Sequence, residues 1–307
     1  MKARRYGTVF GLVFLSAVLW VLTPHFLTVS NLLNIAQQTS INAIVAAGMT
    51  FVIISGGIDL SVGSIVALSG VALGILLQTG QPAMVAVAGA VATGVGCGLL
   101  NGLLVSIGRL PPFIATLGMM SVARGAALVS TEGRPISGFG EAFRWVATGS
   151  VGMVPAPVIV TLLVYLTAHI AITRTTFGRY VYAIGGNEEA TRLSGVAVRF
   201  HKTAIYAVSG LMSAVAAVVL TARLNSAQPI AGMMYELDAI AATVIGGTSL
   251  MGGEGTLFGT LVGALIMGVL RNGLNLLGVS SFLQQIVIGG VIVGAVLVDT
   301  LLKRQRD

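Results

Sequence analysis

AMVAVAGAVATGVGCGLLNGLLVSI, residues 83–107, contains no charged side chain and determines the class of structure that this chain can form. The hydrocarbon core of a bilayer is about 30 Å thick, and an α-helix rises about 1.5 Å per residue. About 20 consecutive apolar residues are therefore needed to cross it. The stretch is long enough and apolar enough to predict a membrane-spanning helix.

The rest of the chain has the same character. Charged residues make up 9% of it, against roughly 25% in a typical soluble domain, and hydrophobic residues make up 55%. A soluble domain with this composition would expose apolar surface and aggregate. The length of 307 residues accommodates about ten spans with short loops. We predict an all-α fold, a polytopic transmembrane helical bundle that forms a single domain over residues 1–307.

Ten apolar segments are long enough, or nearly long enough, to be spans. The first is not a cleaved signal peptide, because no small-x-small cleavage motif follows it. The eighth is short and ends at glycines, so it either crosses or is broken and re-entrant. The predicted spans are Tyr6–Leu22, Ser40–Ser55, Val62–Leu77, Ala83–Ile107, Phe113–Ser130, Pro157–Thr173, Thr203–Ala222, Leu237–Ser249, Thr256–Leu277 and Phe282–Leu302. The polar residues 31–38 are either a lead-in segment or the wet end of the second span.

The formal net charge is +7, and we interpret the basic residues as setting the orientation of the chain in the membrane. Nucleic-acid binding is not indicated, because no basic run is longer than two residues and no aromatic residues are interleaved with basic ones. With both termini in the cytoplasm, twelve of the 17 Lys and Arg residues lie inside, as the positive-inside rule expects. These are Lys2, Arg4, Arg5, Arg109, Arg174, Arg179, Arg192, Arg199, Lys202, Lys303, Arg304 and Arg306.

Residues for catalysis or metal binding are scarce. Cys97 is the only cysteine, and the three histidines fall in separate segments, which argues against disulfides and metal sites. The three lysines are not preceded by glycine, so the Gly-Lys-Ser/Thr element of a phosphate-binding loop is absent. We therefore predict no catalytic residue, no metal site and no cofactor in this chain.

Several glycines lie at spacings of four or five residues within the spans, as at Gly89 and Gly94 and at Gly255, Gly259 and Gly263. Such faces let helices approach closely, which we favour over a flexible pore wall. Two similar glycine-rich breaks, GGIDLSVG (56–63) and GGTSLMG (246–252), both interrupt apolar runs and are both expected near the cytoplasmic side. They suggest related halves, as in transporters built from repeats.

Neutral polar side chains at membrane depth are candidates for a transport pathway. They suit a hydroxylated neutral solute better than an ion, although each of them could equally make interhelical hydrogen bonds. The candidate pathway residues are Gln38, Asn42, Thr50 and Asn272.

Two carboxylates near span ends have two interpretations each. Asp59, between the second and third spans, would either bind a coupling ion or cap the third helix, and the flanking sequence favours capping. Asp238 opens the eighth span with Glu236, where both would stabilise the helix start, and it could pair with Arg223. Arg271, within the ninth span, is expected to face the protein interior or to lie near the outer interface.

The loop 174–202 contains the motif GGNEEATRLSG (185–195). Asn187 suits a helix N-cap, acidic residues occupy the first turn, and Gly195 suits the position after the helix end. About seven helical residues would span roughly 10 Å. Isolated helices this short are marginal in water, so either the loop itself or a partner protein must stabilise this one.

The chain resembles, over nearly its whole length, the permease subunits of bacterial ABC importers for monosaccharides, and among these it most resembles the ribose permeases. The segments that show the resemblance are NLLNIAQQTS (31–40), GIDLSVG (57–63), GGNEEATRLSG (185–195), SAQP (226–229), YELDAIAAT (235–243), GGTSL (246–250) and NGLNLLGVSS (272–281).

The resemblance implies an inner-membrane importer of ribose or a related sugar. Its protein partners would be a cytoplasmic ABC ATPase that binds ATP and Mg, a periplasmic sugar-binding protein and a second permease chain, expected to be an identical copy. The chain would lie in the lipid bilayer, and no nucleic acid would be involved. The helix in loop 174–202 would couple to the ATPase through Gly186, Asn187, Glu188, Glu189, Ala190, Thr191 and Arg192. The external loop 131–156 would either help to dock the binding protein or be a plain solvated loop. The candidate docking residues are Arg134, Glu141, Arg144 and, near the next outer loop, Arg223.

Two other classes of function remain. An ion-coupled secondary sugar transporter would use Asp59 or Asp238 as its titrating carboxylate. A receptor or scaffold subunit would bind partners without transporting a solute.

Overall fold

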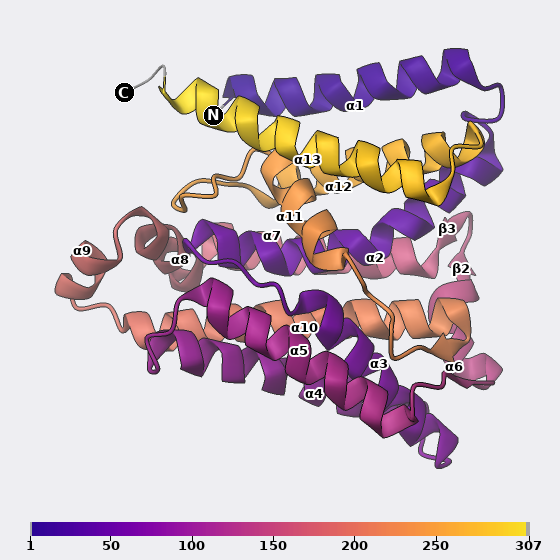
Figure 1. The fold of residues 1–307 in the computed structure, drawn as a ribbon, viewed down its shortest axis with the longest axis horizontal. Coiled ribbons are helices and arrows are strands. Elements are labelled where there is room, and N and C mark those ends of the chain that lie inside the picture. Colours follow the sequence, from indigo (N-terminus) through magenta and orange to yellow (C-terminus); the bar gives the residue numbers. More distant parts are fainter. Residues whose placement is uncertain (1, 305–307) are drawn as a thin grey trace.

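The chain folds into a helical bundle whose longest helices run roughly side by side (Figure 1). The structure, a computed structural model, describes residues 2–304; Arg306, which we assigned to the inward-facing basic residues, lies outside the described residues. Helix α1 begins, and helix α13 ends, at the end of the bundle from which α8 and α9 project (Figure 1).

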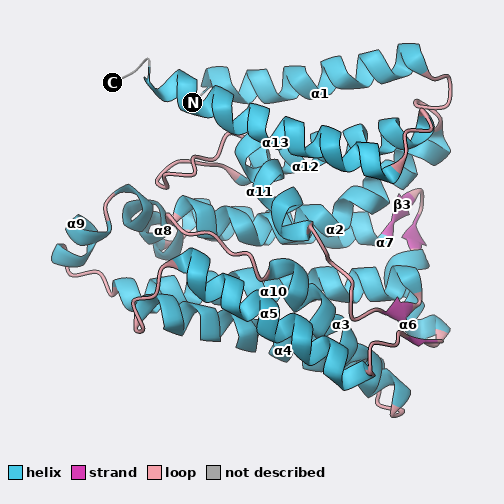
Figure 2. Ribbon diagram, in the orientation of Figure 1, coloured by secondary structure: helices cyan, strands magenta, loops and turns pink. Residues whose placement is uncertain are grey.

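Thirteen helices form within the described residues. Their bounds are α1 Lys2–Leu22, α2 Val29–Ile54, α3 Val62–Gln78, α4 Ala83–Ser106, α5 Pro112–Thr131, α6 Glu141–Thr148, α7 Ala156–Arg174, α8 Thr176–Gly186, α9 Glu188–Leu193, α10 Val198–Leu224, α11 Tyr235–Ile245, α12 Leu257–Leu276 and α13 Ser281–Arg304. Two small antiparallel pairs join β1 Ile136–Ser137 to β4 Ser226–Ala227, and β2 Ser150–Val151 to β3 Val154–Pro155. Figure 2 shows these strands at the end of the bundle opposite α9.

Each predicted span corresponds to a helix. Six helices, α2, α4, α5, α7, α10 and α12, are long and apolar enough to cross a membrane, and three shorter apolar helices cover 7–22, 62–78 and 281–294. The eighth predicted span becomes α11, whose eleven residues would reach only about 17 Å. The multi-pass helical bundle is confirmed, whereas ten complete crossings stay a prediction.

The second span is longer than predicted, because α2 begins at Val29 rather than Ser40. Thr28 caps its first turn by accepting a hydrogen bond from the backbone N–H of Asn31. The side chain of Asn31 then donates to the carbonyl of Phe26 and pairs with Asn272. Polar residues 31–38 therefore form the first turns of this helix, and the hydrogen bonds of Asn31 within the protein help the helix to begin before them.

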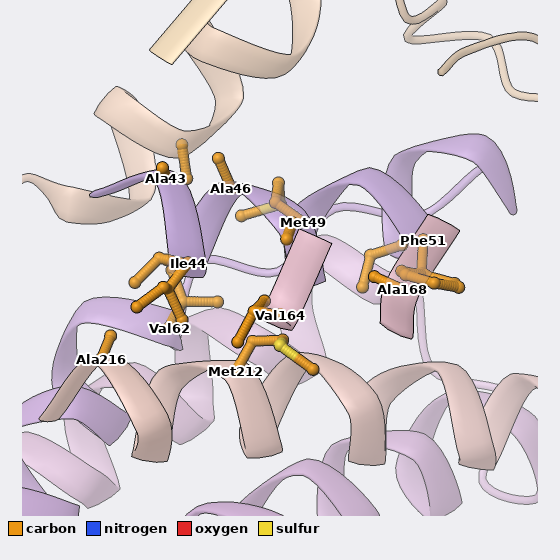
Figure 3. Packing of buried hydrophobic residues seen from close by; sticks show 14 of the residues in the cluster. Ala43, Ile44, Ala46, Met49, Phe51, Val62, Val164, Ala168, Met212 and Ala216 are labelled. Atoms are coloured by element: carbon orange, nitrogen blue, oxygen red, sulfur yellow. The ribbon is translucent and has the colours of Figure 1, made fainter. Parts of the chain in front are cut away.

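Helix α2 runs through the centre of the bundle, and its residues from Ala43 onward are almost fully buried. Figure 3 shows its side chains, among them Ile44 and Met49, packed near Val62 of α3, Val164 of α7 and Met212 of α10. Because neighbours surround α2 on several sides, a movement of this helix would displace those neighbours too.

The glycine faces pack against helices, as predicted. A side chain at Gly94 on α4 would collide with the carbonyl of Gly210 on α10, and one at Gly98 would collide with the main chain of Tyr206. On α12, Gly259 and Gly263 lie equally close to the main chain of α11. Small residues let these backbones approach closely, as is common between helices in membranes.

Candidate functional site

Helix α9 projects from one end of the bundle (Figure 1). Asn187 has extended backbone angles, and its side-chain oxygen accepts a hydrogen bond from the N–H of Ala190 at 2.9 Å, which confirms the predicted N-cap. Gly195 follows the helix with φ +85°, the left-handed conformation expected there. The helix has six residues rather than about seven, because Ser194 already occupies the C-cap.

Contacts within the loop stabilise this short helix. Lys202 on α10 pairs with Glu188 at 2.6 Å, and Arg192 pairs with Glu189. Because Arg192 donates hydrogen bonds to Glu189, the pKa of that carboxyl lies below its ordinary value. The hydroxyl of Thr191, a buried residue, donates to the carbonyl of Asn187 at 2.7 Å. The loop therefore holds α9 in place and leaves its outer face uncovered.

That outer face combines charge with exposed apolar side chains. Glu188, Glu189 and Arg192 are exposed, as are Leu193, at 74%, and nearby Phe200 on α10, at 69%. At an end of the bundle that is in contact with water, exposed large apolar side chains beside a charged helix are typical of a protein-binding surface.

Behind α9, three segments meet backbone to backbone at glycines. We call Gly56, Gly185, Gly252 and Gly253 the glycine junction. The N–H of Gly253 donates to the carbonyl of Ile54, at the end of α2, at 2.8 Å, and a side chain at Gly185 would collide with both groups. The two glycine-rich breaks noted in the sequence thus lie together, and α8, which leads into α9, packs against both.

A second feature, the polar cavity, lies between α2, α10, α11 and α12 and has a volume of about 420 Å³. Gln38 and Leu224, at its edge, are exposed, whereas the residues on its inner walls are mostly buried. It is lined by Gln38, Thr39, Ile41, Asn42, Leu220, Arg223, Leu224, Tyr235, Asp238, Ala264, Met267, Gly268 and Arg271.

An ion pair crosses this cavity. Asp238, which is 3% exposed, accepts hydrogen bonds from Arg271 to both carboxylate oxygens at 2.9 Å. Asn42 on α2 donates to the same carboxylate at 3.2 Å. Asp238 does not form the pair with Arg223 that the sequence left possible, because Arg271, one helix away on α12, occupies the carboxylate. Arg271 faces the protein interior, as one of its two predicted placements required.

The four candidate pathway residues do not form one group. Gln38 and Asn42 line the polar cavity. Thr50, deeper in the bundle, shares a hydrogen bond of 2.8 Å with Thr260, and Asn272 pairs reciprocally with Asn31. Thr50 and Asn272, like Asn42, therefore make the interhelical hydrogen bonds that were the alternative interpretation.

Sequence reasoning did not place Tyr235, Asp238 and Arg271 in a common site. The available signal was an acidic and a basic residue at membrane depth in two neighbouring apolar segments, which are expected to pair when the helices pack. It was missed because Asp238 lies in the first turn of its helix, where a role in capping explains a carboxylate equally well.

Asp59 is fully buried and acts at the start of α3. One carboxylate oxygen accepts from the backbone N–H and the hydroxyl of Ser61, and the other accepts from Ser209 on α10 at 2.8 Å. Asn101 on α4 donates to the hydroxyl of Ser61 at 2.8 Å. No side chain caps the first turn of α3, so the capping interpretation of Asp59 is wrong. Its carboxylate instead holds Ser61, the residue before the helix, and joins it to α10.

The loop 131–156 lies at the opposite end from α9 and is folded rather than extended (Figure 1). Its helix α6 packs against the bundle through Phe143 and Ala147, and β1 pairs with β4 beyond the end of α10. Arg134 and Glu141 are exposed, while Arg144 is half-buried. Arg223, grouped with them in the sequence, lines the polar cavity instead.

Comparison with known proteins identifies the family. Residues 31–296 match the family described as "Branched-chain amino acid transport system / permease component". The chain is 51% identical to the ribose import permease protein of Escherichia coli (strain K12), with 97% of each chain covered. It is 41% identical to the D-allose transport system permease protein of the same strain, with 98% of this chain and 93% of the relative covered.

A third relative, the L-arabinose transport system permease protein of Escherichia coli (strain K12), is 37% identical, with 96% of this chain and 90% of the relative covered. No solved structure matches the chain. Because the family covers most of the chain and the relatives align along nearly all of it, the chain belongs to this family of transport-system permeases and is a multi-pass protein of the inner membrane.

Proposed function

We propose that this chain is the transmembrane permease subunit of an ATP-binding-cassette importer that moves a monosaccharide, ribose or a related sugar, across the inner membrane. The observation that supports this most strongly is the alignment with a ribose import permease over 97% of both chains. Its other relatives, named for D-allose and L-arabinose, differ in sugar but not in class of solute.

The energy for import comes from a separate cytoplasmic ATPase, which binds ATP and Mg. This chain lacks a Gly-Lys-Ser/Thr motif, and the exposed face of α9 offers that subunit a docking surface. Residues Gly186 to Arg192 then act as the coupling helix. Movement of α9 would pass through α8 to the glycine junction, and from there to the ends of α2 and α11.

We further propose ten crossings with both termini in the cytoplasm. In support, α1 begins and α13 ends at the same end of the bundle as α9 (Figure 1). The crossing that contains α11 would then be completed by the irregular segments at its ends, residues 228–234 and 246–256. By resemblance to these importers, we expect two identical copies of the chain to pair.

At the outer end, a sugar-binding protein docks on the loop 131–156. The exposed side chains of Arg134, Glu141 and Trp145 on this folded loop support the proposal. Arg144→Glu is expected to weaken the ATP hydrolysis that the binding protein stimulates and to leave basal hydrolysis unchanged. Equal loss of both would show that the substitution disturbs folding, and unchanged stimulation would argue against docking here.

The test of the main proposal is uptake of labelled ribose, D-allose and L-arabinose into vesicles that contain the chain, its ATPase and internal ATP, with the binding protein outside. We expect ATP-dependent uptake of at least one sugar that a protonophore does not inhibit. Uptake that needs an ion gradient and no ATP would contradict the proposal. The comparisons give no support to ion coupling, and both of its candidate carboxylates, Asp59 and Asp238, are held by hydrogen bonds.

A further inference from the structure

We propose that the polar cavity is a monosaccharide-binding subsite within the permease itself, in which Asp238, Asn42, Arg271 and Gln38 bind sugar hydroxyls. The inference rests on the proposed function, because that function supplies the class of ligand. It assigns to the permease a sugar site of its own, in addition to the one on a binding protein.

The cavity has the size and position of a binding site. Its volume of about 420 Å³ lies within the range of roughly 300–1,000 Å³ that is typical of small-molecule sites. It is formed by α2, α10, α11 and α12 inside the helical bundle. Polar groups that converge in such a place are costly unless they serve a purpose.

The cavity lining has the hydrogen-bonding capacity that a sugar requires. A sugar hydroxyl both donates and accepts, so its site needs both kinds of partner. Asp238 supplies carboxylate oxygens, Gln38 an amide, and Arg271 donors beyond the single nitrogen that bonds Asp238. Because Asp238 and Arg271 are oppositely charged, the pair favours a neutral polyol over a cation.

A polar group beside the cavity lacks a partner. Thr39, which is 4% exposed, lines the cavity, and its hydroxyl has no hydrogen-bond partner among the described residues. Buried hydroxyls are rarely left unpaired, because desolvation costs about 1–3 kcal/mol. The hydroxyl packs directly against Gly268 on α12, where a side chain would overlap it. A ligand in the cavity would supply the missing partner once α2 and α12 move apart.

The cavity is closed on one side. Between the cavity and the glycine junction, residues 43–54 of α2 are buried, and Thr50 is hydrogen-bonded to Thr260. A sugar that reached the cavity from the α6 end would therefore stop there. Onward passage would require α2 and α12 to separate, which is the movement that the glycine junction could deliver.

The test uses the reconstituted complex with Leu224→Cys at the edge of the cavity, in a Cys97→Ala background that removes the only native thiol. Labelling of the new thiol by a small hydrophilic reagent is followed with ribose, D-allose, L-arabinose or inorganic phosphate present. We expect at least one sugar to slow labelling in a saturable manner, and phosphate to have no effect. Protection by phosphate alone, or by none of the four, would overturn the proposal.

A matched pair of substitutions sharpens the test. Gln38→Leu should raise the sugar concentration needed for protection about tenfold, whereas Gln37→Leu, next to it but outside the cavity lining, should leave it unchanged. Equal effects of the two would overturn the proposal. Sugar uptake is measured on the same vesicles: uptake without protection rejects the subsite alone, and protection without ATP-driven uptake rejects the proposed function alone.

Discussion

The glycine junction and the polar cavity accommodate polar groups within an apolar bundle in different ways. At the glycine junction, main-chain atoms of three segments touch, and side chains are absent from the contact. At the polar cavity, about 20 Å further along α2 at 1.5 Å per residue, side chains line a hollow and bond to one another. A direct main-chain contact suits the transfer of movement, whereas a hollow lined by side chains suits the binding of a solute.

The same physical requirement underlies both regions. A polar group inside the bundle, either a carbonyl at a helix end or a carboxylate, must find a hydrogen-bond partner in the protein, because little water is available there. At the junction, the N–H of Gly253 satisfies the carbonyl of Ile54. At the cavity, Arg271 and Asn42 satisfy Asp238. Each arrangement can be broken separately, which gives three predictions of decreasing size.

The largest effect is expected from Gly185→Ala. Its new methyl group would collide with main-chain atoms of Ile54 and Gly253, which cannot rotate away as a side chain can. We expect a loss of stability of at least about 1–3 kcal/mol and loss of uptake, measured by thermal unfolding and by sugar transport. Gly186→Ala is the matched control for thermal unfolding alone, since open space surrounds that position although it belongs to the proposed coupling helix. Equal losses of stability in the two variants would contradict the close contact.

Next in size is Asp238→Asn, which leaves the Arg271 guanidinium without its ionic partner. Because Arg271 is about one-third exposed, we expect a loss of about 1–3 kcal/mol rather than the larger cost of a fully buried pair, together with impaired uptake. Asp238→Asn with Arg271→Gln removes both charges and should recover stability without recovering uptake. A double variant as unstable as the single one would show that the ion pair is not the reason.

The smallest effect is expected from Thr50→Val, between the two regions. It removes the hydrogen bond to Thr260 and should cost about 1 kcal/mol in thermal unfolding. Thr260→Val should cost a similar amount, and the two losses should not add, because both remove the same bond. Additive losses would show that the hydroxyl groups act independently.

Much of the fold was predictable because membrane solvation imposes it. Every predicted span corresponds to a helix, since a long apolar run in lipid has few alternatives to an α-helix. The start of α2 was misplaced by eleven residues, because the pairing of Asn31 with Asn272, 241 positions away, is invisible in the local sequence. Complete crossing of α11 could not be decided, since its length depends on how its ends pack.

The site was predictable only where its geometry is local. The caps of α9 follow from Asn187 and Gly195, both within a few residues of the helix. The cavity depends instead on four helices that meet in space, so Asp238 and Arg271 could not be paired with assurance from the sequence. The glycine junction is intermediate, because its two similar glycine-rich breaks were visible but their contact with α8 was not.

If α9 couples this permease to an ATPase, changes to its exposed face should separate the two proteins during purification from the native membrane. Glu188→Lys with Glu189→Lys reverses the charge of α9, and Leu193→Glu alters its exposed apolar side chain while keeping both ion pairs. Glu132→Lys with Glu141→Lys is the matched double reversal at the opposite end.

We predict that the wild-type chain and the control purify with a stoichiometric P-loop ATPase, and that both α9 variants remain in the membrane but lose it. Retention of the ATPase by both α9 variants would contradict the role of this helix. A wild-type protein that purifies without an ATPase, and imports sugar when only an ion gradient is supplied, would contradict the account as a whole.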